Sequence, residues 1–122
     1  MPWQVLFQVD FLEEFYALDL KVQDEIAAMT ELLAAAGPAL KRPFADTLKG
    51  SKFANMKELR FDASGGVWRL AYAFDPERNA ILLVAGDKSG GSSKRFYNSL
   101  IAKADARFAG HIAYVKKRIS RT

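Results

Sequence analysis

The residues best suited to chemistry in this sequence are a set of cations and one phenol in its second half. They are Lys57, Arg60, Arg69, Lys88, Lys94, Arg95 and Tyr97. Arginines hold phosphate oxygens bidentately, and a lysine with a lowered pKa, or a tyrosine, can take or give a proton. Such a set fits metal-free RNA cleavage, in which the ribose 2′-hydroxyl attacks phosphorus and negative charge builds on the phosphate oxygens. Tyr97 is also in phase with the apolar stripe of its predicted helix, so core packing is an alternative role for it.

Other familiar kinds of site are not supported by the sequence. There is no cysteine and His111 is the only histidine, so a zinc site is not expected. His111 lies inside a predicted helix, which favours a structural or surface residue over Ser-His-Asp catalysis. The loop 86–93 lacks the Walker A spacing of a nucleotide-binding loop. We therefore expect no metal and no cofactor.

Two predicted strands bring the arginines together. Residues 67–74 alternate, with Trp68, Leu70, Tyr72 and Phe74 on one face and Val67, Arg69, Ala71 and Ala73 on the other. In the preceding strand, Glu58, Arg60 and Asp62 alternate with Leu59 and Phe61. The large apolar groups belong against helices, so Arg60 and Arg69 should share the second face. Because Ala71 and Ala73 are small, we expect that face to be open and able to hold a phosphate chain.

The remaining pattern indicates helices around this sheet. A strand is predicted at 3–9, a helix capped by Asp10 with Glu13 in the capping-box position, and a second helix capped by Asp19. Val22, Ile26, Met29 and Leu33 form the apolar stripe of that helix, which Gly37-Pro38 should end. The run 81–84 predicts a central strand after a turn at 75–79, and Ser92 or Ser93 should cap a long final helix. These two helices should form a hairpin, and the acidic residues on its outer surface are interpreted as a solvated face.

Size, composition and charge limit the class of protein. A chain of 122 residues, half of them hydrophobic, predicts one domain spanning 1–122 with a packed core. No apolar run approaches the ~20 residues of a membrane span, and no secretory signal is visible, so we expect a cytoplasmic protein without membrane contact. Residues 1–40 carry a net charge of −6 and residues 41–122 carry +10. This asymmetry favours a polyanionic partner of the second part, most simply nucleic acid.

A basic stretch with interleaved aromatic residues lies ahead of the strands. It contains Lys41, Arg42, Lys49 and Lys52, with Phe44 and Phe53 between them. Rings that stack on bases and cations that meet phosphates suit an RNA surface, to which Lys94 would add. A solvated loop with two core phenylalanines is the alternative.

An ordered set of short motifs resembles one known family. The motifs are Leu48-Lys49-Gly50-Ser51, Met56-Lys57-Glu58-Leu59-Arg60, residues 68–75 around Trp68-Arg69, Gly86-Asp87-Lys88, and Lys94-Arg95-Phe96-Tyr97. Together they resemble the phage-derived, HigB-like branch of the RelE/ParE toxin superfamily, over nearly the whole chain. The resemblance implies an α+β fold with an N-terminal strand and helical hairpin, an antiparallel sheet of about four strands packed by helices, and a long C-terminal helix.

The resemblance also implies a function. HigB-like members are ribosome-dependent mRNA endonucleases that act in the A site and are held inactive by a helix-turn-helix antitoxin. Carried over by position, the catalytic roles fall to Lys57 or Arg60, Arg69, Lys88 or Arg95, and Tyr97. Arg69 would stabilise the phosphorane, and Tyr97 would stack on a base or move a proton. The alternative is a ParE-like toxin that is no nuclease and inhibits a protein target such as DNA gyrase. Glu58, between two cations, is not explained by this mechanism.

Overall fold

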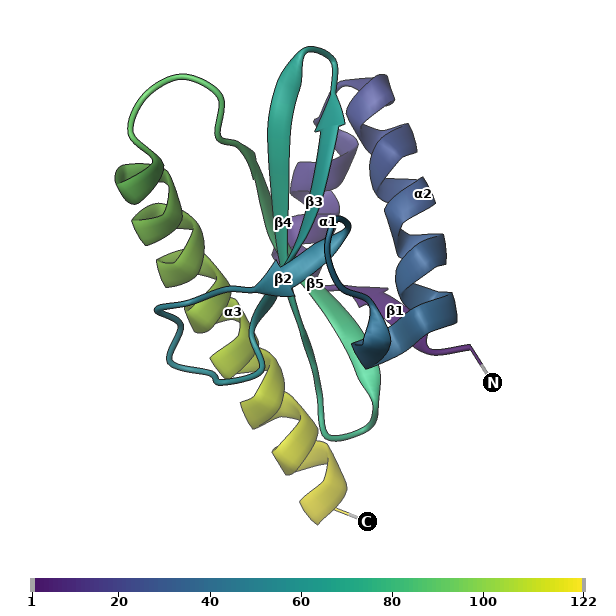
Figure 1. Ribbon diagram of the computed structural model, residues 1–122. Coiled ribbons are helices and arrows are strands. Elements are labelled where there is room, and N and C mark those ends of the chain that lie inside the picture. Colours follow the sequence, from purple (N-terminus) through teal and green to yellow (C-terminus); the bar gives the residue numbers. More distant parts are fainter. Residues whose placement is uncertain (1, 122) are drawn as a thin grey trace.

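The structure, a computed structural model, describes residues 2–121 and consists of one sheet between two helical layers (Figure 1). Its strands are β1 (Gln4–Phe7), β2 (Ala45–Thr47), β3 (Lys57–Ala63), β4 (Gly66–Phe74) and β5 (Asn79–Asp87). Its helices are α1 (Val9–Tyr16), α2 (Leu20–Ala36), the short 3₁₀ helix η1 (Gly37–Ala39) and α3 (Ser93–Ser120). The α+β class and the long last helix are thus confirmed.

The described residues form a five-stranded sheet in the order β1-β5-β4-β3-β2. β1 runs parallel to β5, and the other neighbours are antiparallel. The sheet is therefore mixed, one strand wider than expected. A parallel pair needs a long crossover, and the α1–α2 hairpin and β2–β4 supply it before the chain returns as β5 beside β1.

The first helix begins differently from the prediction. Gln8 is its N-cap, because the Gln8 side chain accepts a hydrogen bond from the Phe11 backbone at 3.0 Å, and Asp10 lies in the first turn. Asp19 caps α2 as predicted, with its carboxylate accepting from the Lys21 backbone at 2.8 Å. α2 ends at Gly37, whose positive φ of 57° a residue with a side chain rarely adopts.

One core lies between the sheet and the α1–α2 hairpin. The α2 stripe Val22, Ile26, Met29 and Leu33 is buried there, against Leu59, Leu70, Tyr72 and Leu82 of the strands. This confirms the predicted helix face and the predicted apolar face of β4. β5 lies between β1 and β4, and its run 81–84 is buried on both faces, as expected for a central strand.

A second core lies on the other face of the sheet, so the expectation of an open face is wrong. Ala71 and Ala73 are fully buried, and they pack with Leu100, Ala104 and Phe108 of α3. Figure 1 shows α3 on the side of the sheet opposite α2. The small side chains let the helix approach the strands closely, which is the reason that a pair of alanines does not by itself indicate an uncovered surface.

Candidate functional site

Arg60 and Arg69 face each other directly across two strands. They are register partners in the antiparallel β3–β4 pair, so their side chains lie on the same face of the sheet, as the alternation predicted. On the other side of β4, Arg69 is paired with Gly86 of β5. Opposed side chains in such a pair start about 5 Å apart. The two arginine side chains therefore start from neighbouring points on one face of the sheet.

The end of this face that carries the arginines is partly covered by the first turns of α3. Arg69 is only 6% exposed. Its Nη1 donates to the Trp68 carbonyl at 2.9 Å, and its Nε donates to the Tyr97 hydroxyl at 3.2 Å. The Arg60 side chain is 21% exposed. Arg60 is therefore the more exposed of the two arginines, and Arg69 is buried beneath it, where it is bonded to Tyr97.

Glu58 joins these groups and was not recognised from the sequence as a site residue. Its Oε2 accepts a hydrogen bond from Arg60 Nη1 at 2.7 Å, and its Oε1 accepts one from the Tyr97 hydroxyl at 2.9 Å. The Arg69 Nε lies 3.9 Å from the same Oε1. Glu58 is 4% exposed, which is rare for a glutamate unless it is paired. The sequence did indicate that Glu58 lies on the same face of its strand as Arg60, because the two residues are two positions apart.

Tyr97 comes from the second turn of α3 and packs its ring edge-on to Phe96, 5.2 Å between centroids. Burial raises the pKa of the Tyr97 phenol, and the hydrogen bond to Glu58 raises it further, while the hydrogen bond from Arg69 acts in the opposite direction. The phenol is therefore neutral near pH 7. Tyr97 packs against the second core, which confirms the packing role given as the alternative, and its hydroxyl also belongs to the polar cluster. Its role in chemistry stays a prediction.

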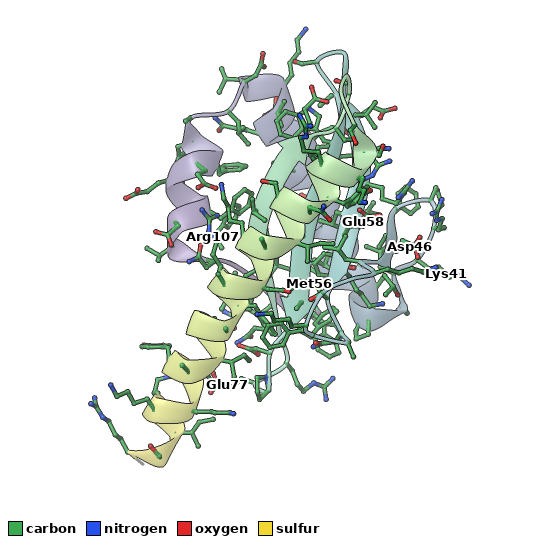
Figure 2. The ribbon with its side chains drawn as sticks, turned by 90° about the vertical axis from the view of Figure 1, so that its left-hand side faces the viewer. Lys41, Asp46, Met56, Glu58, Glu77 and Arg107 are labelled. Atoms are coloured by element: carbon green, nitrogen blue, oxygen red, sulfur yellow. The ribbon has the colours of Figure 1, made fainter. Side chains whose placement is uncertain are left out.

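A groove opens onto this cluster. One hollow of about 360 Å³ is lined by Arg42, Asp46, Thr47, Leu48, Lys49, Glu58 and Tyr97. A neighbouring hollow of about 440 Å³ is lined by Lys49, Gly50, Lys94, Tyr97, Asn98, Ile101 and Ala102. Because Lys49 and Tyr97 line both, the two hollows form one groove between the segment 42–50 and α3. In Figure 2, Glu58 lies beside the N-terminal half of α3, with Asp46 on the same side of the molecule.

Three predicted RNA-binding cations line this groove, namely Arg42, Lys49 and Lys94. Arg42 pairs with Asp46, Nη2 to Oδ2 2.8 Å, and this exposed pair lowers the pKa of the Asp46 carboxyl through the Arg42 hydrogen bond. Within residues 2–121, Lys49 and Lys94 form no ion pair. Lys49, Lys94 and Tyr97 all line the second hollow, and two unpaired cations with an aromatic ring are the kinds of group that a single strand of RNA binds.

Five predicted site residues lie elsewhere. Lys57 pairs with Tyr72, so it alternates onto the α2 face, opposite to Arg60. Lys88 follows β5, and its backbone N donates to the Val67 carbonyl. Arg95 lines a separate hollow of about 390 Å³ with Gly86, Gly90 and other residues of the β5–α3 connection. Lys41 and Lys52 are exposed and line neither part of the groove.

Asp105 of α3 holds the groove wall in place. Its Oδ1 accepts from Ser51 Oγ at 2.5 Å and its Oδ2 accepts from the Lys52 backbone at 2.9 Å. Phe53, in the same loop, packs its ring edge-on to Phe108 of α3, 5.0 Å between centroids. The segment that carries Lys49 is therefore attached to the helix that carries Lys94 and Tyr97. Sequence reasoning did not find Asp105, because its partners lie more than fifty residues away.

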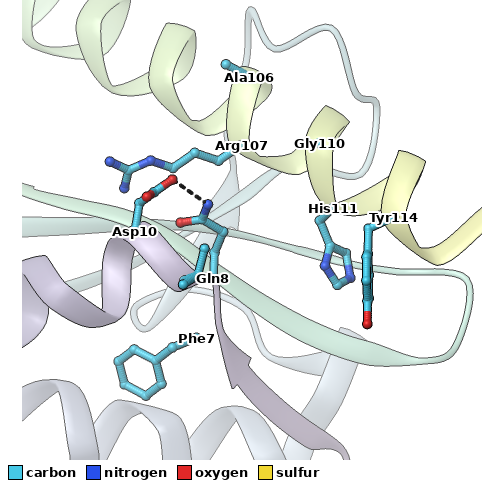
Figure 3. A pocket seen from close by; sticks show the side chains of 9 residues that line it. Phe7, Gln8, Asp10, Ala106, Arg107, Gly110, His111 and Tyr114 are labelled. Atoms are coloured by element: carbon cyan, nitrogen blue, oxygen red, sulfur yellow. Dashed lines mark hydrogen bonds between the residues drawn. The ribbon is translucent and has the colours of Figure 1, made fainter. Parts of the chain in front are cut away.

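A further hollow of about 670 Å³ lies between the start of α1 and the middle of α3 (Figure 3). Its lining includes Gln8, Asp10, Arg107, His111 and Tyr114. His111 Nε2 lies 2.8 Å from the buried carboxylate of Asp75, and the His111 ring stacks on Phe108. His111 thus ties α3 to the turn after β4, in agreement with the structural role predicted for it.

Residues 2–121 contain no group of three or more His, Asp or Glu side chains that could hold a metal ion. No helix among them has the length and apolar character needed to cross a membrane.

Comparison with known proteins gives the family. Residues 13–109 match the family model described as "Phage derived protein Gp49-like". The chain is similar to two proteins of Mycobacterium tuberculosis (strain ATCC 25618 / H37Rv). It is 43% identical over 97 residues to "Putative toxin HigB2", covering 79% of this chain and 48% of that protein. It is 42% identical over 99 residues to "Putative toxin HigB3", covering 81% and 84%. The chain thus spans about half the length of the first of these relatives and most of the second.

A solved structure shows the same fold. It is a mutant of the E. coli toxin RelE in the free state, with a TM-score of 0.59 and 16% identity, covering 84% of this chain and 97% of that one. At this identity the likeness concerns the fold alone. Taken with the family match and the two relatives, it places this chain in the Gp49-like family, within the HigB-like branch of the RelE/ParE toxin superfamily of toxin–antitoxin systems.

Proposed function

We propose that this toxin is a ribosome-dependent endonuclease that cleaves mRNA through attack by the ribose 2′-hydroxyl. The observation that carries the proposal is a groove lined by Arg42, Lys49, Lys94 and Tyr97 beside two paired arginines. Tyr97 and Glu58, which line the groove, are hydrogen-bonded to Arg69 and Arg60 respectively. Cations without counter-ions in a groove attract a phosphate backbone, and guanidinium groups match the oxygens of a phosphate.

The geometry suggests how the groups would act. RNA would lie along the groove, with Lys49 and Lys94 against backbone phosphates and a base over Tyr97. Arg60, the more exposed arginine, would contact the non-bridging oxygens of the scissile phosphate, with Arg69 stabilising the same charge from below. The 2′-hydroxyl gives its proton to solvent and its oxygen bonds to phosphorus as the phosphorus–5′-oxygen bond breaks. The departing 5′-oxygen takes a proton from solvent, which leaves a 2′,3′-cyclic phosphate and a 5′-hydroxyl. Tyr97, neutral near pH 7, would bind and orient the RNA and would not act as the base.

We propose that the ribosome and a cognate antitoxin are the partners. Cleavage would occur on mRNA in the A site, where the ribosome presents a codon in extended form. A small helix-turn-helix antitoxin would hold the toxin inactive between episodes of activity. The relatives carry the word toxin in their names, which supports the existence of such an antitoxin for this chain.

One observation favours a second candidate function. Arg69 is almost fully buried and already bonded to the Trp68 carbonyl and to Tyr97. An arginine in this state stabilises the fold, as it would in a ParE-like toxin that inhibits a protein target such as DNA gyrase. The cations Lys49 and Lys94 along the groove favour the nuclease, because a fold-stabilising arginine does not require them.

The test is a brief induction of the protein, followed by mapping of mRNA 5′ ends on translated and untranslated versions of one transcript. The nuclease predicts new 5′-hydroxyl ends confined to translated codons. DNA breaks with intact mRNA would support the gyrase alternative and contradict the nuclease. Arg60→Lys, which keeps the charge but loses the planar fork, should remove the cuts, whereas Lys117→Ala, at the far end of α3, should leave them unchanged.

A further inference from the structure

Two arginines opposite each other in a sheet need a counter-ion. Like charges at directly paired positions destabilise a pair of strands, and the effect grows where water is excluded. Arg60 and Arg69 are such a pair, and Arg69 is 6% exposed. Some group close to both must therefore balance their charge if the pair is to persist before any phosphate binds.

Glu58 is placed to supply that charge. It lies two residues before Arg60 on β3, on the same face, and its carboxylate is 2.7 Å from Arg60 Nη1 and 3.9 Å from Arg69 Nε. A carboxylate buried to this extent would be costly without such partners, and removing one partner of a buried pair is strongly destabilising. Asp62 lies on the same face of β3, two residues after Arg60, and it is exposed. Of Glu58 and Asp62, it is Glu58 that is buried in contact with both arginines.

The same carboxylate also fixes Tyr97. Its Oε1 accepts a hydrogen bond from the Tyr97 hydroxyl at 2.9 Å, and the same hydroxyl oxygen accepts one from Arg69 Nε at 3.2 Å. Glu58 therefore links β3 to α3 and, through Tyr97, to β4. We propose that Glu58 is a positioning residue of the RNA-cleaving site, which holds Arg60 and Tyr97 in one fixed arrangement and supplies the negative charge that allows the two arginines to stay paired. This inference rests on the proposed function.

The arrangement has a chemical consequence for Tyr97. Its proton is engaged by a carboxylate, so the phenol remains a neutral hydrogen-bonding group. The hydrogen bond to Glu58 contributes to the raised pKa of Tyr97, second to burial. Replacing the carboxylate with an uncharged amide should therefore lower the pKa of Tyr97, because the remaining hydrogen bond from Arg69 favours the phenolate.

The experiment compares Glu58→Gln with Asp62→Asn, a matched loss of one carboxylate charge from the same face of the same strand. Cleavage of a translated mRNA is measured for both, in the wild-type background and in Tyr97→Phe. In parallel, the ¹³Cζ resonance of Tyr97 is titrated with pH in the purified protein. Glu58→Asp, which keeps the charge but is one methylene shorter, is included in case the glutamine variant does not fold.

We expect Glu58→Gln to slow cleavage on the order of 100-fold, mostly in kcat, and Asp62→Asn to leave it unchanged. In the Tyr97→Phe background, Glu58→Gln should cost less than in the wild type, because the tie of Glu58 to α3 is already lost and only its contact with the arginines remains to be removed. The pKa of Tyr97 should fall in Glu58→Gln and stay constant in Asp62→Asn. Glu58→Asp should cleave more slowly than the wild type while retaining its fold.

The outcomes separate this inference from the proposed function. If the wild-type protein does not cleave mRNA, the proposed function fails, and the Tyr97 titration still reports whether Glu58 holds the phenol. If the wild type cleaves mRNA and Glu58→Gln cleaves it equally fast, Glu58 is not a positioning residue. The same conclusion follows if Glu58→Gln reduces the cleavage rate by the same factor in the Tyr97→Phe background as in the wild type. An unchanged Tyr97 pKa in Glu58→Gln would also overturn the inference.

Discussion

Asp105 accepts a hydrogen bond from Ser51 over 2.5 Å, between Oδ1 and Oγ, although the two residues lie 54 positions apart. The bond joins the loop after β2 to the middle of α3, and these two segments form the walls of the groove. The width of the groove therefore depends on a contact outside the cluster of arginines.

Asp105→Ala should consequently lower both stability and RNA binding. The variant leaves the Ser51 hydroxyl and the Lys52 amide without their acceptor, a loss of about 2 kcal/mol in the free energy of unfolding. Urea denaturation measures this loss, and titration with a short single-stranded RNA measures binding. Glu31→Ala, an exposed acidic residue on α2, serves as the control. Equal stability of the two variants would contradict the role assigned to Asp105.

Lys49→Ala and Lys94→Ala should each weaken RNA binding without affecting the fold, because both side chains are exposed and line the groove. If each lysine contacts one phosphate of a single strand, each variant should reduce the dependence of log K on log salt by about 0.7. Binding measured at several salt concentrations gives this slope. Lys117→Ala should keep the wild-type slope; a decrease as large as that of Lys49→Ala would mean that binding is not confined to the groove.

Stability should decrease in acid partly through Glu14. Its carboxylate receives two hydrogen bonds from Arg107, whose bonding lowers the pKa of Glu14, while burial acts in the opposite direction. A carboxyl whose pKa is lower in the folded state contributes stability above its unfolded pKa and loses it as the pH falls through the folded pKa. Urea denaturation at about pH 6 and about pH 3 should show a larger loss for the wild type than for Glu14→Gln. Equal losses would show that the pair contributes nothing.

Tyr72→Phe should be neutral or stabilising. The Tyr72 hydroxyl is fully buried, has no hydrogen-bond partner among the described residues, and burial raises the pKa of this phenol far above its usual value. Removing an unsatisfied hydroxyl relieves a desolvation cost of about 1 kcal/mol. Thermal unfolding measures the change. Tyr97→Phe, which loses two hydrogen bonds, serves as the control and should lower the stability. A large loss of stability in Tyr72→Phe would contradict the prediction, because it would mean that the Tyr72 hydroxyl has a hydrogen-bond partner.

Several features of the fold were predictable because they depend on local periodicity. The period of two puts Arg60 out of phase with Leu59 and Phe61, and Arg69 out of phase with Leu70 and Tyr72, so both arginines are predicted on the face opposite the large apolar groups. The spacing of Val22, Ile26, Met29 and Leu33 marks one face of a helix, and Gly37 supplies the positive φ that ends it. These patterns indicated the elements and the arginine pair, which are properties of neighbouring residues.

Other features depended on which distant segments meet. Ala71 and Ala73 are compatible with an open face or with a closely packed helix, and only the position of α3 decides between them. Likewise, Glu58 in a strand gives no sign that a tyrosine 39 residues later will donate to it. The sequence by itself determined the elements and the faces of their residues, because backbone geometry sets both. The tertiary structure alone decided which face is covered and which charges are paired, because packing between distant segments sets them.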